Sequence, residues 1–232
     1  MKNIFDRHHK RYDAWYDRNR FTYLSELNAL KKVLPAKGIG LEIGVGTGRF
    51  AAPLGIQYGI DPSRRMLEIA EGRGINVRPG RGEDLPFKNA TFDYVAIIIT
   101  ICFVKNPGRV LKEANRVLKK KGRIILGIVD RNSFLGKFYR KEKKSVFYED
   151  ARFFGVKELT GLLKSAGFDD VSYFQTLYDL PEKITSVQNV RKGYGNGGFV
   201  VIKAGKKQNL ELTYKRKSPG KPSRIQSRNR SS

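Results

Sequence analysis

The spacing of apolar positions changes repeatedly along the chain and predicts alternating strands and helices. Short apolar runs rich in β-branched residues, such as FDYVAIIIT at 92–100, are typical of strands buried on both faces. Longer segments with apolar residues every three or four positions, such as 21–34, are typical of amphipathic helices. Strands are expected at 38–43, 56–60, 75–77, 92–100, 123–129, 170–178 and 197–204. Helices are expected at 21–34, 61–74, 107–122 and 155–168.

This order of elements predicts an α/β fold with a doubly wound, mostly parallel sheet of seven strands and helices on both faces. The last two expected strands have no helical pattern between them. We therefore expect the C-terminal strand to run antiparallel, in an arm at the edge of the sheet.

The pattern divides the chain into three parts. Residues 1–35 form a helical cap, 36–204 form one α/β domain, and 205–232 form a tail. Within the domain, residues 130–150 are charged and aromatic without a clear period, which indicates an insertion. The tail combines low hydrophobicity with high positive charge, so we expect it to be disordered.

Charge adds a possible partner to this picture. The 232 residues carry 46 Lys and Arg against 22 Asp and Glu, a formal net charge of +24. Such a field attracts polyanions, and the basic surface and tail leave nucleic acid open as a partner. The bases outside the tail are scattered and not grouped with aromatic residues, which favours an ordinary solvated surface.

Cysteine content and apolar run lengths indicate a cytoplasmic protein. Cys102 is the single cysteine, so neither an intrachain disulfide nor a zinc site of the usual cysteine type is expected. The first twenty residues lack the apolar core of a signal peptide. The longest apolar stretch, at 94–104, is too short to span a bilayer, so no membrane association is expected.

The segment LEIGVGTGRF at 41–50 places Gly44, Gly46 and Gly48 just after the first strand of the domain. In open α/β sheets, ligands bind beyond the carboxyl ends of the strands, and such a loop suits a nucleotide-like ligand. Asp61 ends the second strand, where a carboxylate can accept both ribose hydroxyls or can cap the next helix. NAD and S-adenosylmethionine both meet these requirements.

Glu42 favours one of these two ligands. It precedes the first glycine by two residues, where a carboxylate would repel a pyrophosphate. The same carboxylate suits the cationic amino acid end of S-adenosylmethionine, which has no phosphate. Glu42 therefore points to S-adenosylmethionine rather than NAD.

Four motifs in order and spacing carry a resemblance to a known family. They are LEIGVGTGRF, GIDPSRRMLEIA, GEDLPFKNATFDYV and VLKEANRVLKKKGRIILG. They resemble class I S-adenosylmethionine-dependent methyltransferases of the methyltransferase type 11 family, over residues 36–204. Other runs, such as GIVDRNSFLG and GYGNGGFVVI, resemble a small thermophile subgroup of uncertain substrate. The resemblance implies a Rossmann-like, seven-stranded fold, with S-adenosylhomocysteine as product and no metal.

The resemblance also implies roles by position. Glu42 and the loop around Gly44, Gly46, Thr47 and Gly48 would hold the methionine end of the cofactor. Asp61 would bind the ribose, with Pro62 and Met66 packing near the adenosine. Backbone at Gly82 and Glu83 would meet the adenine, and Arg81 stands where the family often has an acid, so Glu83 or Asp84 takes that role. Thr100, Ile101 and Cys102 would form the wall between cofactor and substrate.

Methyl transfer from a sulfonium is an in-line displacement with an activated donor, so no catalytic residue can be named from the sequence. The aromatic segment RYDAWY at 11–16 resembles a cap over the cofactor, with Tyr12, Trp15 and Tyr16 as pocket candidates or as core residues. Lower-ranked pocket candidates are Tyr139, Tyr178 and Tyr194, while His8 and His9 are expected to be solvated. We expect a small-molecule acceptor, with RNA or a ribosomal protein as the alternative.

Overall fold

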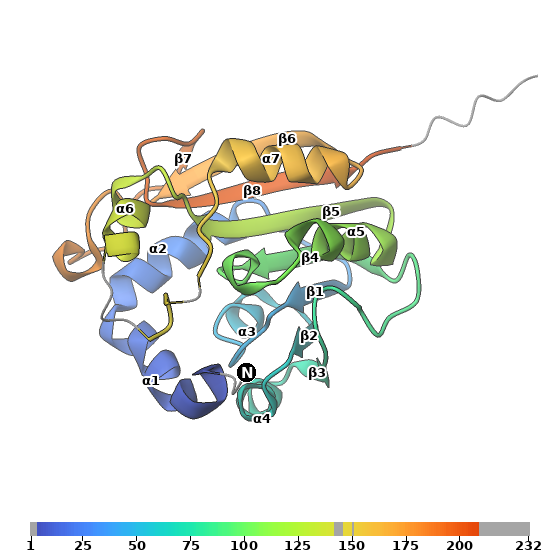
Figure 1. Cartoon of the computed structure of the whole chain (residues 1–232), viewed down its shortest axis with the longest axis horizontal. Helices are drawn as coiled ribbons and strands as arrows, with labels where there is room; N and C mark the ends of the chain where they lie inside the picture. The colour runs from blue at the N-terminus through green and yellow to red at the C-terminus, as the bar shows by residue number, and fades with distance from the viewer. Residues whose placement is uncertain (1–3, 142–145, 150, 209–232) are drawn as a thin grey trace, which may run out of the picture.

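The computed structural model describes residues 4–141, 146–149 and 151–208, and its centre is one eight-stranded sheet (Figure 1). The strand order is β3-β2-β1-β4-β5-β8-β6-β7. Strands β1 to β5 are parallel, and β8 runs antiparallel between β5 and β6. The strands are β1 (Gly40–Ile43), β2 (Tyr58–Asp61), β3 (Asn76–Pro79), β4 (Phe92–Ile98), β5 (Leu118–Val129), β6 (Phe168–Thr176), β7 (Arg191–Lys192) and β8 (Phe199–Lys206).

Each of the seven strands expected from the sequence is present, and the antiparallel C-terminal strand is confirmed. The expectation of seven strands is one short. The additional strand, β7, has two exposed residues and pairs antiparallel with β6. A strand without a buried side chain gives no hydrophobic signal, so the pattern of apolar positions could not reveal it.

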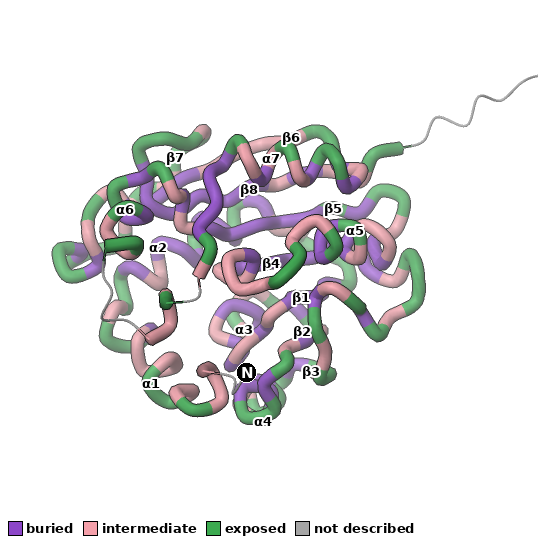
Figure 2. The backbone as a smooth tube through the Cα atoms, in the orientation of Figure 1, coloured by how far each residue is buried: buried purple, intermediate pink, exposed green. Residues whose placement is uncertain are grey.

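Helices cover both faces of the sheet, as expected (Figure 1). One core lies between the sheet and helices α5 and α7, and the other lies between the sheet and the N-terminal helices with α6. The buried course of β5 and β8 in Figure 2 explains their long apolar runs. The helices are α1 (Ile4–Arg18), α2 (Arg20–Lys31), α3 (Ala51–Leu54), α4 (Arg64–Gly72), α5 (Pro107–Val117), α6 (Phe134–Lys141) and α7 (Val156–Ser165).

Helix α5 ends five residues before the expected end at Gly122. Its last residue is Val117, and Leu118 already pairs with Phe92 as the start of β5. Leu118 is fully buried, whereas the lysines after it offer no apolar side chain for another helical turn. The expectation of a helix over 107–122 is therefore wrong for its final turn.

The segment 130–150 contains regular structure that its irregular pattern did not predict. Helix α6 lies inside it, and the Ser133 hydroxyl before the helix accepts a hydrogen bond from Gly136 N at 3.0 Å. Residues 142–145 and 150 of this segment, and most of the tail expected to be disordered (209–232), lie outside the described residues. Strand β8 extends to Lys206 and so includes the first two residues assigned to the tail.

Two helices lie in the N-terminal segment for which a cap was expected. Helix α1 is bent at His8, and α2 follows it against β6, β8 and α3. Leu27 and Leu30 of the expected apolar face of α2 are buried, whereas Phe21 is 40% exposed. The buried face of α2 also includes the polar residues Thr22, Ser25 and Glu26, which the apolar pattern did not indicate. Among the described residues, no helix has both the length and the hydrophobicity needed to cross a bilayer.

Candidate active site

The glycine loop after β1 has a backbone that only glycine adopts easily. Gly44, Gly46 and Gly48 have φ values of 73°, 52° and 79°, in the left-handed region. A Cβ at Gly44 would lie 2.1 Å from Thr100 Cγ2, and the Thr100 hydroxyl donates to Gly44 O at 3.1 Å. At Gly46 the nearest atom to a Cβ would be Tyr12 Cε1 at 3.8 Å, so this glycine faces α1 across open space.

Two carboxylates lie at the carboxyl ends of the neighbouring strands β1 and β2. Glu42 is 1% exposed, and its Oε2 has no hydrogen-bond partner among the described residues. Asp61 accepts hydrogen bonds from Ser63 N at 2.8 Å and Gly46 N at 3.1 Å. Burial raises the pKa of Glu42 well above its usual value, and the charge of Asp61 adds to this effect. Burial also raises the pKa of Asp61 to about 6.

This pair of acids has no cationic partner in the part of the chain that the structure describes. An orphaned buried acceptor and a concentration of negative charge are costly unless a ligand supplies donors or positive charge. A cationic amino group at Glu42 and ribose hydroxyls at Asp61 would provide both. The two carboxylates, Glu42 and Asp61, therefore fit the chemistry of S-adenosylmethionine.

One partly buried carboxylate, that of Asp13, holds helix α1 over this loop. Asp13 accepts hydrogen bonds from the Thr47 hydroxyl at 2.7 Å, from Arg49 Nη2 at 2.6 Å and from Arg73 Nη1 at 2.9 Å. Although burial opposes it, the hydrogen bonds from Arg49 and Arg73 hold the pKa of Asp13 well below its usual value. The α1 helix therefore covers the glycine loop through charge-assisted contacts.

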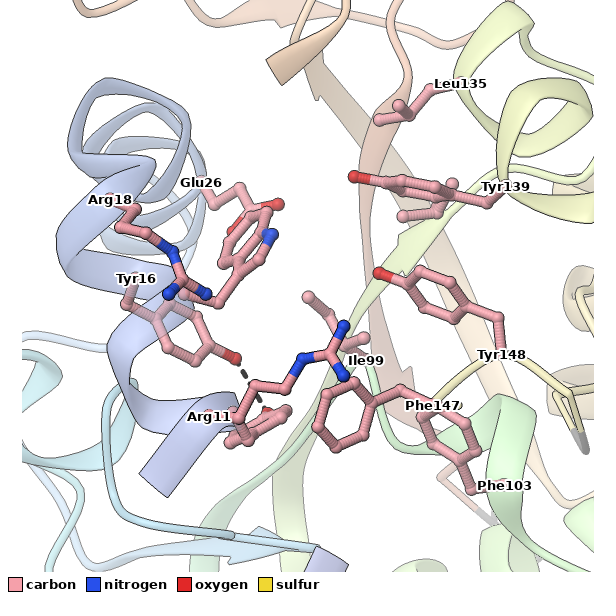
Figure 3. A pocket seen from close by; sticks show the side chains of 13 residues that line it. Arg11, Tyr16, Arg18, Glu26, Ile99, Phe103, Leu135, Tyr139, Phe147 and Tyr148 are labelled. Atoms are coloured by element: carbon pink, nitrogen blue, oxygen red, sulfur yellow. Dashed lines mark hydrogen bonds between the residues drawn. The ribbon is translucent and has the colours of Figure 1, made fainter. Parts of the chain in front are cut away.

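A cavity of about 150 Å³ lies behind the cover formed by α1 (Figure 3). It is bordered by α1, by the end of β4, by α6 and by residues 146–149. Most of its wall is aromatic, from Tyr12, Trp15, Tyr16, Tyr139, Phe147 and Tyr148. Tyr12 is common to both regions, since it lines the cavity and also faces Gly46. The cavity thus adjoins the glycine loop, where an acceptor can meet a donor.

Comparisons with known proteins agree with this geometry. A family model described as a methyltransferase domain matches residues 41–126. A solved structure from Thermotoga maritima, described as an S-adenosylmethionine-dependent methyltransferase and possible histamine N-methyltransferase, is 52% identical. The match covers 88% of this chain and 98% of that chain, with a TM-score of 0.86.

This chain belongs to the S-adenosylmethionine-dependent methyltransferase family. An uncharacterized protein of Methanocaldococcus jannaschii is 50% identical over 205 residues, which is 88% of this chain and 99% of that protein. The demethylmenaquinone methyltransferase of Bacillus licheniformis is 31% identical over 172 residues, covering 60% of this chain and 74% of that enzyme. The protein is thus a methyltransferase, and its methyl acceptor is the open question.

The residues expected near the adenosine, Asp61, Pro62 and Met66, lie at or just before the start of helix α4 and differ from one another in their contacts and burial. Ser63, and not Asp61, caps α4, because its hydroxyl accepts from Met66 N at 3.3 Å. Pro62 precedes this cap and is exposed, while Met66 is 1% exposed. Ser63 also donates a hydrogen bond to Asp6 of α1. The α4 start is therefore a second attachment point for the cap.

The loop at 81–84 supplies backbone more readily than side chains. Gly82 is buried, and a Cβ there would lie 2.8 Å from Ile43 Cγ2. The Glu83 carboxylate accepts hydrogen bonds from Lys105 N at 3.0 Å and Asn106 N at 3.3 Å. Asp84 is exposed. Because Glu83 Oε1 is already used to hold the start of α5, Asp84 keeps the freer carboxylate in this loop.

The three residues that were expected to form a wall after β4 do not all lie together. Thr100 touches the glycine loop, whereas Ile101 and Cys102 border a separate small space of about 20 Å³. Cys102 does not line the larger cavity, and burial raises the pKa of its thiol to about 12. Among the lower-ranked tyrosines, Tyr139 lines the cavity, while Tyr178 and Tyr194 lie elsewhere, against Arg191 and Tyr173.

The two histidines are partly buried in α1, so the expectation that they are solvated is wrong in degree. His9 Nδ1 lies 2.9 Å from Asp6 O, and the His8 ring packs edge-on against Phe147 at 6.2 Å between centroids. Neither imidazole lines the cavity. The structure gives them a packing role within the cap.

Several cavity residues escaped the sequence-based prediction, and two of them, Ile99 and Glu26, have unusual surroundings. The others are Arg11, Arg18, Phe103, Val129, Leu135, Phe147 and Tyr148. Ile99 borders both spaces with φ of 53°, a strained conformation for a β-branched residue. Glu26 lines the cavity from α2, is 2% exposed, and has no partner for Oε2 among the described residues. Burial raises the pKa of Glu26 to about 8. The one signal of this in the sequence was the position of Glu26, an acid between apolar residues of the helical segment 21–34.

Proposed function

We propose that this methyltransferase transfers the methyl group of S-adenosylmethionine to a small molecule bound in the aromatic cavity. The observation that carries the donor assignment is the buried Glu42 carboxylate, whose Oε2 has no hydrogen-bond partner among the described residues, together with Asp61 on the neighbouring strand. The observation that supports the acceptor assignment is the position of the cavity, which Tyr12 connects to that loop.

In this proposal Glu42 receives the amino group of the donor, and the backbone of the glycine loop surrounds its amino acid end. Asp61 accepts the ribose hydroxyls, with Pro62 and Met66 beside the adenosine. Gly82, Glu83 and Asp84 border the adenine, while Thr100 and Ile101 support the wall below. Thr47 acts indirectly, because its hydroxyl is bonded to Asp13.

Bound S-adenosylmethionine supplies an activated methyl group, whose transfer in line to a nucleophile breaks a carbon–sulfur bond and leaves S-adenosylhomocysteine. The residues of this chain need to align the acceptor and exclude water. The aromatic residues of the cavity restrict the acceptor to one side of the glycine loop. Helix α1 covers both the methyl donor and the methyl acceptor. A proton acceptor is required only when the acceptor arrives protonated.

The size of the cavity supports a small acceptor. A volume near 150 Å³ accommodates a single aromatic ring, and an extended polymer would have to displace α1. The descriptions of two relatives name small-molecule acceptors. The Thermotoga maritima protein is described as a possible histamine N-methyltransferase, and the Bacillus licheniformis enzyme as a demethylmenaquinone methyltransferase. These relatives give no support to RNA or a ribosomal protein as the acceptor.

Isothermal titration calorimetry with S-adenosylmethionine, S-adenosylhomocysteine and NAD tests the donor assignment. We expect micromolar binding of the first two and none of NAD. Glu42→Gln, which keeps the shape and removes the charge, should weaken S-adenosylmethionine binding at least tenfold. Glu68→Gln on the exposed face of α4 is the matched control and should leave it unchanged. Binding of NAD alone, or an unchanged affinity in Glu42→Gln, would overturn the proposal.

A further inference from the structure

Glu26 is a buried acid inside a ring-lined cavity, and nothing in the donor site uses it. It projects from α2 into the space between α1 and α6 (Figure 3). Its side chain is 2% exposed, and Oε2 has no hydrogen-bond partner among the described residues. Such a group is expensive to bury alone, so a protein that keeps it has a use for it when a ligand is present.

The surroundings of Glu26 are phenolic rather than cationic. The hydroxyl groups of Tyr139 and Tyr148 point into the cavity from the side opposite α1 (Figure 3). Tyr12 and Tyr16 complete the ring of phenols, with their hydroxyls 2.7 Å apart. Burial raises the pKa of Tyr16 and of Tyr148, and the charge of Glu26, which lines the same cavity, adds to both shifts.

Two charged residues besides Glu26 line this cavity. Arg11 and Arg18 of α1 line it, yet both residues are exposed to solvent. Neither forms an ion pair with Glu26 in the part of the chain that the structure describes, and burial alone accounts for the raised pKa of Glu26. Their charge is screened by water, whereas that of Glu26 is not. The inner end of the cavity is therefore lined by aromatic rings and by the unpaired acid Glu26.

A carboxylate surrounded by aromatic rings is suited to one ligand chemistry, an organic ammonium ion. The ammonium would pair with Glu26, and the ring faces add cation–π attraction. We infer that the methyl acceptor is a small amine, bound as its ammonium ion by Glu26 within the aromatic cavity. The inference rests on the proposed function, because it takes this cavity to be the acceptor site.

The same residue solves a chemical problem of amine methylation. An ammonium ion has no lone pair, so it must lose a proton before it attacks a methyl group. Glu26 can take that proton, with one N–H bond broken and one O–H bond formed, which leaves a neutral amine beside a neutral acid. A raised pKa makes Glu26 a stronger base than an exposed glutamate. The methylated nitrogen then carries the positive charge that the sulfonium has lost.

Charge-matched probes of cavity size test this inference. Benzylamine, benzyl alcohol and benzoate share a ring and differ in charge, and each is titrated into the whole protein saturated with S-adenosylhomocysteine at pH 8. We expect benzylamine to bind at least tenfold more tightly than the other two. Glu26→Gln should abolish this preference. Thr22→Val is the matched control, since Thr22 is equally buried and unpartnered on α2 but does not line the cavity.

The pH dependence separates a binding role from a structural one. Below pH 8 the free Glu26 is protonated, so binding of an ammonium ion must displace that proton. Affinity for benzylamine should rise by about tenfold per pH unit from pH 6 to 7.5 in the wild type and stay flat in Glu26→Gln. The groups that face Glu26 are Arg11, Arg18, Tyr12, Tyr16, Tyr139 and Tyr148. Burial raises the pKa of each of these four tyrosines further above the pH range of the test.

Equal binding of benzylamine and benzyl alcohol by the wild type overturns the inference, as does no binding of benzylamine or a preference for benzoate. A preference for benzylamine that survives in Glu26→Gln also overturns it. These results would leave the proposed function standing as long as S-adenosylmethionine binds and depends on Glu42. Loss of S-adenosylmethionine binding itself would count against the proposed function instead.

Discussion

Asp13 of α1 and Arg73, which follows α4, form a two-point contact in which both guanidinium Nη atoms donate to the carboxylate at 2.9 Å. The same carboxylate accepts from Arg49 and from the Thr47 hydroxyl. One side chain thus joins the N-terminal cap to the glycine loop and to α4. In the proposed function the methyl donor and the methyl acceptor both lie beneath α1. Loss of the Asp13–Arg73 contact would therefore affect cofactor binding as well as the position of α1.

Asp13→Ala should loosen the cap without unfolding the domain. The change leaves Arg49 and Arg73 without a shared acceptor, and since these side chains are partly exposed we expect a loss of about 1–3 kcal/mol in unfolding free energy. Amide hydrogen exchange in residues 4–18 should become faster, and S-adenosylmethionine should bind at least tenfold more weakly. Both are measurable by mass spectrometry and calorimetry.

Asp17→Ala is the control for this prediction. Asp17 also pairs with Arg49, at 2.8 Å, but its side chain is 68% exposed, so we expect a loss below about 0.5 kcal/mol. If Asp13→Ala and Asp17→Ala affect exchange in α1 equally, the Asp13 carboxylate is not what holds the cap.

The glycine loop allows stability and cofactor binding to be separated. Gly44→Ala would place its methyl 2.1 Å from Thr100 Cγ2, so we expect it to destabilise the protein by several kcal/mol or to prevent folding. Gly46→Ala meets only Tyr12 Cε1 at 3.8 Å, and its positive φ costs about 1 kcal/mol. Thermal unfolding should show this contrast.

Gly46→Ala should nevertheless weaken S-adenosylmethionine binding about tenfold, because its methyl group points into the space between the loop and α1 where the donor would lie. Wild-type affinity in this variant would show that the donor does not approach Gly46. Gly55→Ala, at a positive φ far from this space, controls for backbone strain alone.

The sequence predicted most of the scaffold because the scaffold depends on local patterns. β-Branched apolar runs correspond to β1, β4, β5 and β8, and the glycine loop lies where its position after a buried strand indicated. Glu42 and Asp61 followed from the same reasoning, since both end strands that neighbour each other in a parallel sheet. Their roles toward the donor stay predictions.

The remaining features depend on contacts between distant segments. Asp13 meets Arg73 sixty positions away, and no local pattern reports such a pairing. Glu26 is buried because α1 and α6 close over a face of α2 that alone would be solvated. Ile99 adopts φ of 53° only because the surrounding strands fix its backbone, including its N–H bond to Gly127 O at 2.8 Å. Tertiary packing decided each of these positions.

Binding of S-adenosylmethionine should weaken as the pH falls below about 6. The free Asp61 carboxyl has a pKa raised to about 6 by burial, with Asp6 adding to the effect, and only its ionised form accepts two ribose hydroxyls. The part of the affinity that depends on Asp61 should therefore be present above pH 6 and fall by up to about tenfold per pH unit below it. Titrations from pH 5 to 8 measure this profile.

Asp61→Asn should bind S-adenosylmethionine more weakly at pH 8 and lose the step near pH 6. Glu42→Gln serves as the companion variant, because Glu42 titrates above its usual range and faces the same ligand. It should keep the step that belongs to Asp61. A step near pH 6 that persists in Asp61→Asn would assign the titration to another group.

Glu26→Gln should make the ligand-free protein more stable, by an amount that depends on pH. The pKa of Glu26 is about 8 in the folded chain against 4.5 in an exposed glutamate. Its contribution to stability is fully present below pH 4.5 and is lost as the pH rises to 8. The advantage of Glu26→Gln should therefore be small at pH 4 and grow to at most about 5 kcal/mol by pH 8.

Urea unfolding of the wild type and Glu26→Gln at several pH values measures this difference, with Glu68→Gln as an exposed control that should follow the wild type. Parallel curves would show that Glu26 is solvated or paired in solution, which the burial described above does not allow. Saturating benzylamine should reduce the difference at pH 8, because an ammonium ion stabilises the ionised carboxylate in the wild type alone. A buried acid that destabilises the empty protein and is relieved by a cation is a binding group, whereas one that destabilises it under both conditions is a packing defect.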